Sequence, residues 1–186
     1  MMSSGRSNKL TQRIGEYLVC AELARRGLIA TPFSGNVPTF DVLATDDQVR
    51  TVPIQVKASR GDSWPSDATK WMDIVLDPQT NRQCYRGPRL ISNPDLIYVC
   101  VSIARPASGC DRFFVLTKAQ LQEACITSYR DWMEPLGWKR PRNPMSFDLR
   151  YKVIAIQKYE DNWMVIADRL QQACPDRSLA PDTPSR

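Results

Sequence analysis

The chain has 186 residues, which is enough for one substantial hydrophobic core and too few for two ordinary ones. Its 42% hydrophobic and 24% charged residues exclude a disordered or fibrous protein, and the net charge of +5 favours polyanionic partners only mildly. Histidine is absent, so any catalysis must use carboxylates, lysine, tyrosine or a metal ion instead of the commonest general base.

The first predicted element is a helix over residues 10–26, which follows a flexible N-terminus over residues 1–8. Gly27 is a plausible stop for this helix, since glycine readily adopts the left-handed conformation found there. The main apolar stripe has helical spacing and is made of Leu10, Ile14, Tyr17, Leu18 and Ala21.

A second apolar side of the same helix consists of Val19, Cys20 and Leu23. Glu16 falls on this side, three, four and seven residues before those apolar neighbours. A carboxylate in that position is not placed for free solvation, so we expect Glu16 to have a specific role.

Two strands are predicted next, over residues 40–44 and 49–58. In the second strand the alternation places Gln55 and Lys57 side by side on one face and the aliphatic residues on the other. Pro53 indicates that this strand begins at an edge of the sheet or starts pairing only after the proline.

The remainder of the chain alternates strands, loops and helices. Loops or turns are expected over residues 59–70 and 77–94, and irregular or short helical pieces over residues 128–150. Strands are expected over residues 72–76, 96–103, 113–116 and 153–156. Thr117 predicts a helix start with Gln120 at the capping-box position, and this helix should run to about Ala124. A closing helix is expected near residues 162–173. We therefore predict a single domain over residues 9–173 and a disordered tail over 174–186.

Six cysteines are scattered along the chain without a CxxC pair. Zinc sites need closely spaced cysteine and histidine, so no zinc is expected. The N-terminus lacks the apolar segment of an export signal, and no apolar run is long enough to span a bilayer. We expect a cytoplasmic location, no disulfides and no association with membranes.

The order of polar residues suggests a metal-dependent hydrolytic site. A magnesium ion prefers oxygen ligands and often uses only one or two carboxylates. Asp41 can supply the main carboxylate, Gln55 an amide oxygen and Val56 a backbone carbonyl. Lys57, one side-chain period beyond Gln55, can reach the attacking water or the phosphate. Glu16 would complete the cluster from the helix, directly or through a water.

The segments Gly15-Glu16, Asp41-Val42-Leu43-Ala44 and Ile54-Gln55-Val56-Lys57 together resemble the PD-(D/E)XK nuclease superfamily. The resemblance is closest to the branch that includes archaeal Holliday-junction resolvases and methylation-dependent restriction nucleases, and it covers about residues 10–60. It implies an α/β fold with a restriction endonuclease-like αβββαβ core, in which helices flank a mixed central sheet. In such cores a helix carries Glu, a hairpin strand carries Asp, and the next strand carries Glu-x-Lys or Gln-x-Lys.

By this resemblance the catalytic set is Glu16, Asp41, Gln55 and Lys57, and the activity is metal-dependent hydrolysis of DNA with Mg2+ or Mn2+. DNA is the implied partner, and a homodimer is a candidate assembly because relatives cut two strands. The sequence departs from the pattern in that no proline precedes Asp41. It also departs at Gln55, which replaces an acid and removes one ligand charge.

Gln55 keeps a second hypothesis open, a catalytically inactive module of the same fold that binds nucleic acid or protein. An RNA nuclease would use the same residues. Further nucleic-acid contacts are expected from Ser59 and Arg60, just after the Lys57 strand, and from a basic stretch that contains Lys139, Arg140 and Arg142.

Each candidate also has a purely structural interpretation. Asp41 can cap the turn before its strand, and Glu16 can pair with Arg13 or Arg26 on the helix surface. The basic stretch can be an ordinary solvated surface. The tryptophans Trp64, Trp71, Trp132, Trp138 and Trp163 can stack on bases, although in a domain of this size most tryptophans belong to the core.

Overall fold

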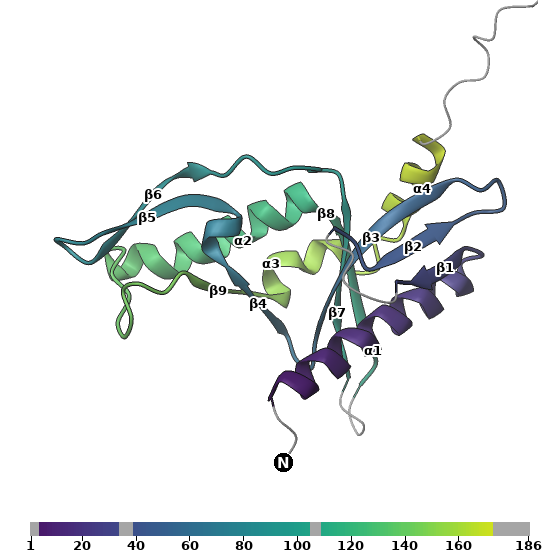
Figure 1. Ribbon diagram of the computed structural model, residues 1–186, viewed down its shortest axis with the longest axis horizontal. Helices are drawn as coiled ribbons and strands as arrows, with labels where there is room; N and C mark the ends of the chain where they lie inside the picture. Colours follow the sequence, from purple (N-terminus) through teal and green to yellow (C-terminus); the bar gives the residue numbers. More distant parts are fainter. Residues whose placement is uncertain (1–3, 34–38, 105–108, 173–186) are drawn as a thin grey trace, which may run out of the picture.

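A five-stranded mixed sheet forms the centre of the protein in the computed structural model, which describes residues 4–33, 39–104 and 109–172 (Figure 1). The elements follow in the order α1 (Ser4–Arg25), β1 (Ile29–Pro32), β2 (Val42–Thr45), β3 (Thr51–Ser59), β4 (Ser63–Asp67), the short 3-10 turn η1 (Ala68–Lys70), β5 (Met72–Asp77), β6 (Arg82–Pro88), β7 (Ile97–Ser102), β8 (Arg112–Thr117), α2 (Lys118–Met133), η2 (Glu134–Leu136), β9 (Asp148–Lys152), α3 (Val153–Ile156), η3 (Gln157–Tyr159) and α4 (Met164–Gln172).

The central sheet has the strand order β1-β2-β3-β7-β8. The three N-terminal strands are antiparallel neighbours, β3 pairs with β7 in parallel from Ile54↔Ile97 to Ser59↔Ser102, and β8 runs antiparallel to β7. The predicted fold class, an α/β protein with helices flanking a mixed central sheet, is confirmed.

Each face of the sheet is covered by its own hydrophobic cluster. On one face, the aliphatic side chains of β2, β3 and β7 pack against α1 and α4 through Val19, Leu23 and Ile166. On the other face, Tyr98 and Cys100 of β7 belong to a second cluster with α2, β4, β5 and β9. The six residues of β7 are all buried, which confirms its prediction as a central strand covered on both faces.

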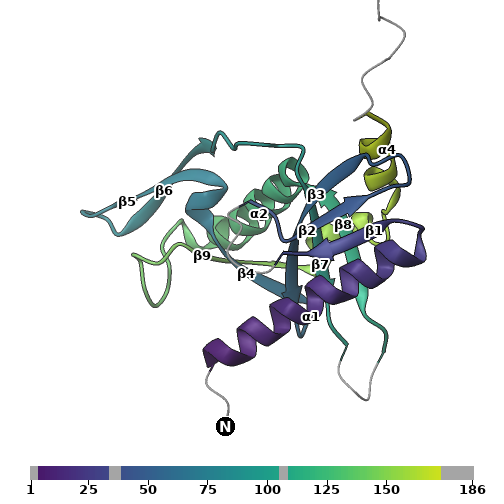
Figure 2. The same ribbon diagram turned by 45° about the vertical axis from the view of Figure 1, so that its right-hand side comes forward.

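The parallel connection from β3 to β7 is made without an α-helix among the described residues. It consists of β4, η1 and the β5–β6 hairpin, which extends away from the central sheet alongside α2 (Figures 1 and 2). β4 pairs with β9, which follows α2 in the chain. Strands therefore make this connection, and α2 covers the same face of the sheet from a later position in the sequence.

Pro53 lies inside β3 and not at its start. It is in register with Leu43 of β2, whereas the pairing with β7 begins only at Ile54. The pairing to β7 thus starts just after the proline, as predicted, so the missing N–H of Pro53 leaves no gap in that ladder.

Helix α1 starts at Ser4, earlier than predicted, and Gly27 ends it with a φ of 82°. Its buried face is the second apolar side, with Val19 and Leu23 almost fully buried. The other stripe lies mostly outward: Tyr17 is 58% exposed, and Leu18 packs against the sheet from its border. The side that carries Glu16 is thus the one that packs on the sheet.

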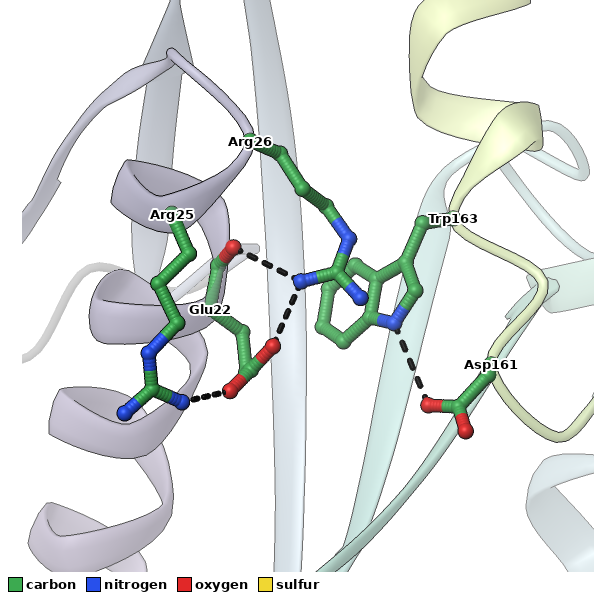
Figure 3. A network of polar contacts seen from close by, with 5 residues as sticks. All are labelled: Glu22, Arg25, Arg26, Asp161 and Trp163. Carbon is green, nitrogen blue, oxygen red and sulfur yellow. Dashed lines mark hydrogen bonds and ion pairs between the residues drawn. The ribbon is translucent and has the colours of Figure 1, made fainter.

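The C-terminal end of α1 is tied to the loop before α4 (Figure 3). Glu22 binds both Arg25 and Arg26, and the guanidinium of Arg26 lies 4.4 Å from the ring centre of Trp163. Trp163 donates from Nε1 to Asp161 at 3.3 Å. These contacts join the first and last helices over the same face of the sheet, so Arg26 is occupied and is not the partner of Glu16.

Several segments differ from the sequence prediction. Residues 153–156 form α3 and not a strand, because the β4–β9 ladder ends at Ser63↔Lys152 and no strand remains to pair with them. The expected loops over 59–70 and 77–94 contain β4 and β6, and β1 was not predicted. α2 also continues past Ala124 to Met133, with the predicted capping box at Thr117 and Gln120 in place.

The two clusters share one sheet, in keeping with the single domain predicted over residues 9–173. That division remains a prediction, and residues 174–186 lie outside the described part of the chain. Among the described helices, none has the length and apolarity needed to cross a membrane.

Gly15 is the point of closest approach between α1 and β3. A Cβ at this position would lie 2.4 Å from the Cβ of Ala58. We expect Gly15→Ala to lower the free energy of unfolding by about 1–3 kcal/mol despite the better helix propensity of alanine. Urea unfolding measures the effect.

Adding Ala58→Gly to Gly15→Ala removes the opposing methyl group and should restore part of the lost stability. Gly61→Ala serves as the control, since a Cβ there meets nothing within 4 Å. An unchanged Gly15→Ala protein, or a double variant no more stable than the single one, would contradict this account of the helix–sheet contact.

Candidate active site

Asp41 stands at the point where the antiparallel ladder between β2 and β3 ends. Its backbone N–H donates to the carbonyl of Ile54 at 2.9 Å, and its carbonyl accepts from the N–H of Phe33, also at 2.9 Å. The backbone of Asp41 is thus held from both sides. Its half-buried side chain lies on the face opposite to Val42, which is fully buried.

The carboxylate of Asp41 takes the place of the missing strand partner of Val56. Oδ2 accepts the backbone N–H of Val56 at 2.8 Å and a second hydrogen bond from the side-chain amide of Gln55. Strand β2 begins at Val42, opposite Ile54, so no residue of β2 is paired with Val56. The N–H and carbonyl of one strand residue point to the same side, so the Val56 carbonyl also faces the side of Asp41.

Lys57 follows on the same face of β3. Gln55 and Lys57 alternate with the buried Ile54 and Val56 along β3. Asp41 precedes Val42, which is opposite Ile54, so its side chain points to the same face as that of Gln55. The structure thus brings these three predicted side chains to one face of the sheet.

The surroundings of Lys57 make its proton easier to lose. Desolvation by the neighbouring protein lowers the pKa of Lys57 below its usual value, and the nearby carboxylate of Asp41 opposes this shift without cancelling it. The side chain itself stays open to solvent, because it lines a cleft. An amine that is partly desolvated yet reachable can exchange a proton with a molecule in that cleft.

Glu16 is buried, with only 6% of its surface exposed, and its carboxylate is paired with Arg13 at 2.9 Å. Arg13 also donates to the carbonyl of Phe33 at 3.1 Å, and the N–H of Phe33 bonds to Asp41. Helix α1 carries Glu16 on the face of Val56, which is opposite to the face of Lys57. Glu16 is therefore linked to Asp41 through Arg13 and Phe33, and its direct part in the site remains a prediction.

The donor atoms around Asp41 can hold a divalent ion through a single carboxylate. Among the described residues, no three His, Cys, Asp or Glu side chains gather closely enough to bind a metal ion. Asp41 supplies a carboxylate and Val56 a carbonyl on the same side. Gln55 can add its amide oxygen after a half-turn of the amide, because the amide nitrogen now faces Asp41. Magnesium sites with one or two carboxylates, completed by water and phosphate, have this composition.

The residues predicted to contact nucleic acid are dispersed. The hydroxyl of Ser59 donates to the Ser63 carbonyl, and Arg60 donates to Thr11 of α1. Arg140 is occupied with the carbonyls of Ser146 and Asp148. Lys139 and Arg142 are exposed near β9, and Figures 1 and 2 place that region at the opposite end of the molecule from β1 and β2.

Three cations that the sequence did not single out line the same cleft as Lys57. They are Lys70 of η1, Arg89 after β6 and Lys118 at the start of α2. They come from three separate segments that were predicted to be loops or a helix start, and Arg89 follows two other arginines, Arg82 and Arg86. The fold brings the three together from the connection between β3 and β7 and from the start of α2, so the sequence alone did not group them.

The solved structures that resemble the protein at low identity include an endonuclease and a Holliday junction resolvase. A bacterial homing endonuclease, I-Ssp6803I, aligns at a TM-score of 0.43 and 14% identity, over 89% of this chain and 97% of its own. The Holliday junction resolvase Hjc of the archaeon Archaeoglobus fulgidus aligns at 0.41 and 10%, over 83% of this chain and 94% of its own.

No protein-family model matches the sequence, and the comparison with curated proteins gives no match. The two likenesses concern the fold alone, so the chemistry of the site has to follow from the residues of this chain.

The lowered pKa of Lys57 can be measured by NMR on its Cε and Nζ nuclei. We expect a value below 10.5 in the native protein, and a still lower one in Asp41→Asn, because that variant loses the charge that favours the protonated amine. Asp47→Asn is the control, since Asp47 is an exposed carboxylate in the turn after β2.

The sign of the linked change in stability follows from the same shift. The unfolded chain binds the Lys57 proton up to a higher pH than the native state does, so the free energy of unfolding rises with pH between the native and the unfolded pKa. A native pKa at or above 10.5, or an upward shift in Asp41→Asn, would show that desolvation does not dominate at Lys57.

Proposed function

We propose that the protein is a Mg2+- or Mn2+-dependent endonuclease that hydrolyses phosphodiester bonds in DNA. The observation that carries the proposal is the placement of Asp41, Gln55 and Lys57 on one face of the sheet, where the ladder between β2 and β3 ends. A cationic cleft lies beside them. The motif resemblance to PD-(D/E)XK nucleases supports the same assignment of roles.

Asp41, Val56 and Gln55 would hold the ion through a carboxylate, a backbone carbonyl and an amide oxygen. The bound ion would lower the pKa of water and neutralise charge on the phosphate. The hydrogen bond from the Val56 N–H fixes one oxygen of Asp41 and leaves the second oxygen free of the strand. The side-chain amide of Gln55 would turn so that its oxygen, instead of its nitrogen, faces Asp41. The hydrogen bond between Gln55 and Asp41 would then be replaced by an ion that both residues bind.

Lys57 would carry the proton transfer. A lowered pKa increases the neutral fraction of the amine at a given pH, and the neutral amine can accept a proton from the attacking water. The protonated form can then donate to a phosphate oxygen. Asp41 limits how far the pKa falls, so one pair of residues adjusts both ion binding and proton transfer.

Glu16 would act as a positioning residue in this proposal. It holds Arg13, which bonds to the Phe33 carbonyl, and Phe33 bonds to the backbone of Asp41. A homodimer would bring two such sites to the two strands of a duplex.

One observation favours a second candidate, a nucleic-acid-binding module without catalytic activity. Gln55 donates its amide to Oδ2 of Asp41, so this carboxylate oxygen has two hydrogen-bond donors without any ion. If the amide keeps this orientation, the site offers fewer oxygen ligands. Titration with metal ions separates the two candidates, because only a site that binds the ion gains stability from it.

Purified protein should nick or cut DNA in the presence of magnesium or manganese. Asp41→Ala and Lys57→Ala should each lower the cleavage rate by at least about 10²-fold, because the first removes the only carboxylate of the site and the second its proton carrier. Gel assays on duplex, branched and single-stranded DNA measure this, and an RNA substrate tests the alternative of an RNA nuclease. Asp47→Ala is the matched control. Intact substrates of every form with both metals would overturn the endonuclease proposal.

Gln55→Glu should make the response to metal ions larger. Two adjacent carboxylates repel each other without a divalent ion, so we expect a lower melting temperature in EDTA and a larger rise with magnesium than in the native protein. Differential scanning fluorimetry measures both values. Gln55→Met, which offers no oxygen ligand, should weaken the rise. A native protein without any magnesium or manganese shift would favour the inactive module.

A further inference from the structure

The cleft next to Lys57 has a volume of about 450 Å3 and a markedly cationic lining. Four of its lining side chains are positively charged and none is a carboxylate; the four are Lys57, Lys70, Arg89 and Lys118. The whole chain has 25 basic and 20 acidic residues, so this separation of charge is local. A concave surface lined by one sign of charge attracts the opposite sign.

The cations of the cleft are only partly neutralised by the protein. Lys70 is exposed, and its proximity lowers the pKa of Lys57 through repulsion between like charges. Arg89 lies 4.0 Å from Asp73, a distance at the limit of an ion pair, and it also donates to the Thr69 carbonyl. Lys118 donates to the Ser92 carbonyl, which holds its position but adds no negative charge.

The inner wall of the cleft adds neutral groups. Tyr98, which is in register with Gln55, is 8% exposed, and burial raises the pKa of its hydroxyl to about 12. This hydroxyl therefore remains a neutral donor at physiological pH. Trp71 and Leu121 complete the wall as buried apolar side chains. A strongly hydrated small ion gains little from such a wall, whereas a phosphate attached to a sugar and base can use both the rim and the wall.

We propose that this cleft is a phosphate-binding subsite that holds the nucleic-acid strand beside the reacting phosphate, with Lys70, Arg89 and Lys118 as its cations. The proposal rests on the proposed function in taking nucleic acid as the ligand. It assigns strand binding to the connection between β3 and β7 together with the start of α2, and not to the basic stretch of Lys139 and Arg142.

If the subsite binds DNA, substitution of its cations should weaken DNA binding. Lys70→Gln removes one cation whose side chain is exposed, and Lys70→Gln/Arg89→Gln removes two. The matched control is Lys139→Gln/Arg142→Gln, which has the same change of charge at two exposed residues that do not line the cleft. Fluorescence anisotropy with short fluorescein-labelled duplex and single-stranded DNA, in EDTA, measures binding without cleavage. Thermal melting establishes that each variant is folded.

We expect the cleft variants to bind several-fold more weakly than the native protein. The slope of log K against log[salt] should become less steep by about 0.9 for each phosphate of duplex DNA that the variant no longer neutralises, and by about 0.7 for each phosphate of a single strand. The control pair should keep the native slope. Equal weakening in both pairs, or weakening only in the control pair, would overturn the subsite.

A phosphodiester chain and a free anion share the chemistry of this cleft, and competition separates them. Inorganic phosphate should displace DNA only at concentrations far above that of the DNA itself. Tight phosphate binding combined with DNA binding that is indifferent to Lys70 would overturn the strand subsite. If DNA binds through Lys70 but is never cut, the subsite is supported and the endonuclease proposal is refuted. If DNA is cut but its binding does not depend on Lys70, the endonuclease proposal is supported and the subsite is refuted.

Discussion

The end of the β2–β3 ladder is the constraint on which the candidate site depends. Because β2 begins at Val42, the ladder has no strand partner for Val56, and the carboxylate of Asp41 takes that place at 2.8 Å. A buried backbone N–H without a partner is costly, so the fold itself favours an acceptor at this position. An acid accepts the hydrogen bond of the backbone and at the same time brings a negative charge next to Gln55 and Lys57. The residue that accepts the Val56 N–H is therefore also the one proposed to bind the ion.

The two faces of the central sheet differ in how closely they are covered. The face of Val56 and Ala58 is packed closely by α1, where Gly15 permits contact between helix and strand. The face of Gln55 and Lys57 is covered less completely, because the connection to β7 is made of strands and a hairpin instead of a helix. That looser cover leaves the cleft beside Lys57, and the residues of the connection line it. Desolvation of Lys57 and access to Lys57 thus have the same structural origin.

The sequence predicted local features well wherever a short pattern decides them. The alternation in β3 placed Gln55 and Lys57 on one face, the capping box started α2 at Thr117, and the second apolar side of α1 was the one that buried Glu16. It failed wherever a partner distant in sequence decides the structure. Residues 153–156 have the composition of a strand, yet they form a helix because β4 ends opposite Lys152. For the same reason the cationic cleft was invisible, since its members come from η1, the end of β6 and the start of α2.

Gln55 gives the site a charge balance different from that of a site with two acids. Asp41 contributes one negative charge and Lys57 a positive one that desolvation makes easier to lose. With a single carboxylate, the remaining negative oxygen ligands of a divalent ion would have to come from the phosphate itself. A cluster of cations beside Lys57 raises the local concentration of such phosphates, which partly offsets the missing acid. In the proposed site, ion binding and strand binding would support each other, so each would be stronger when the other is present.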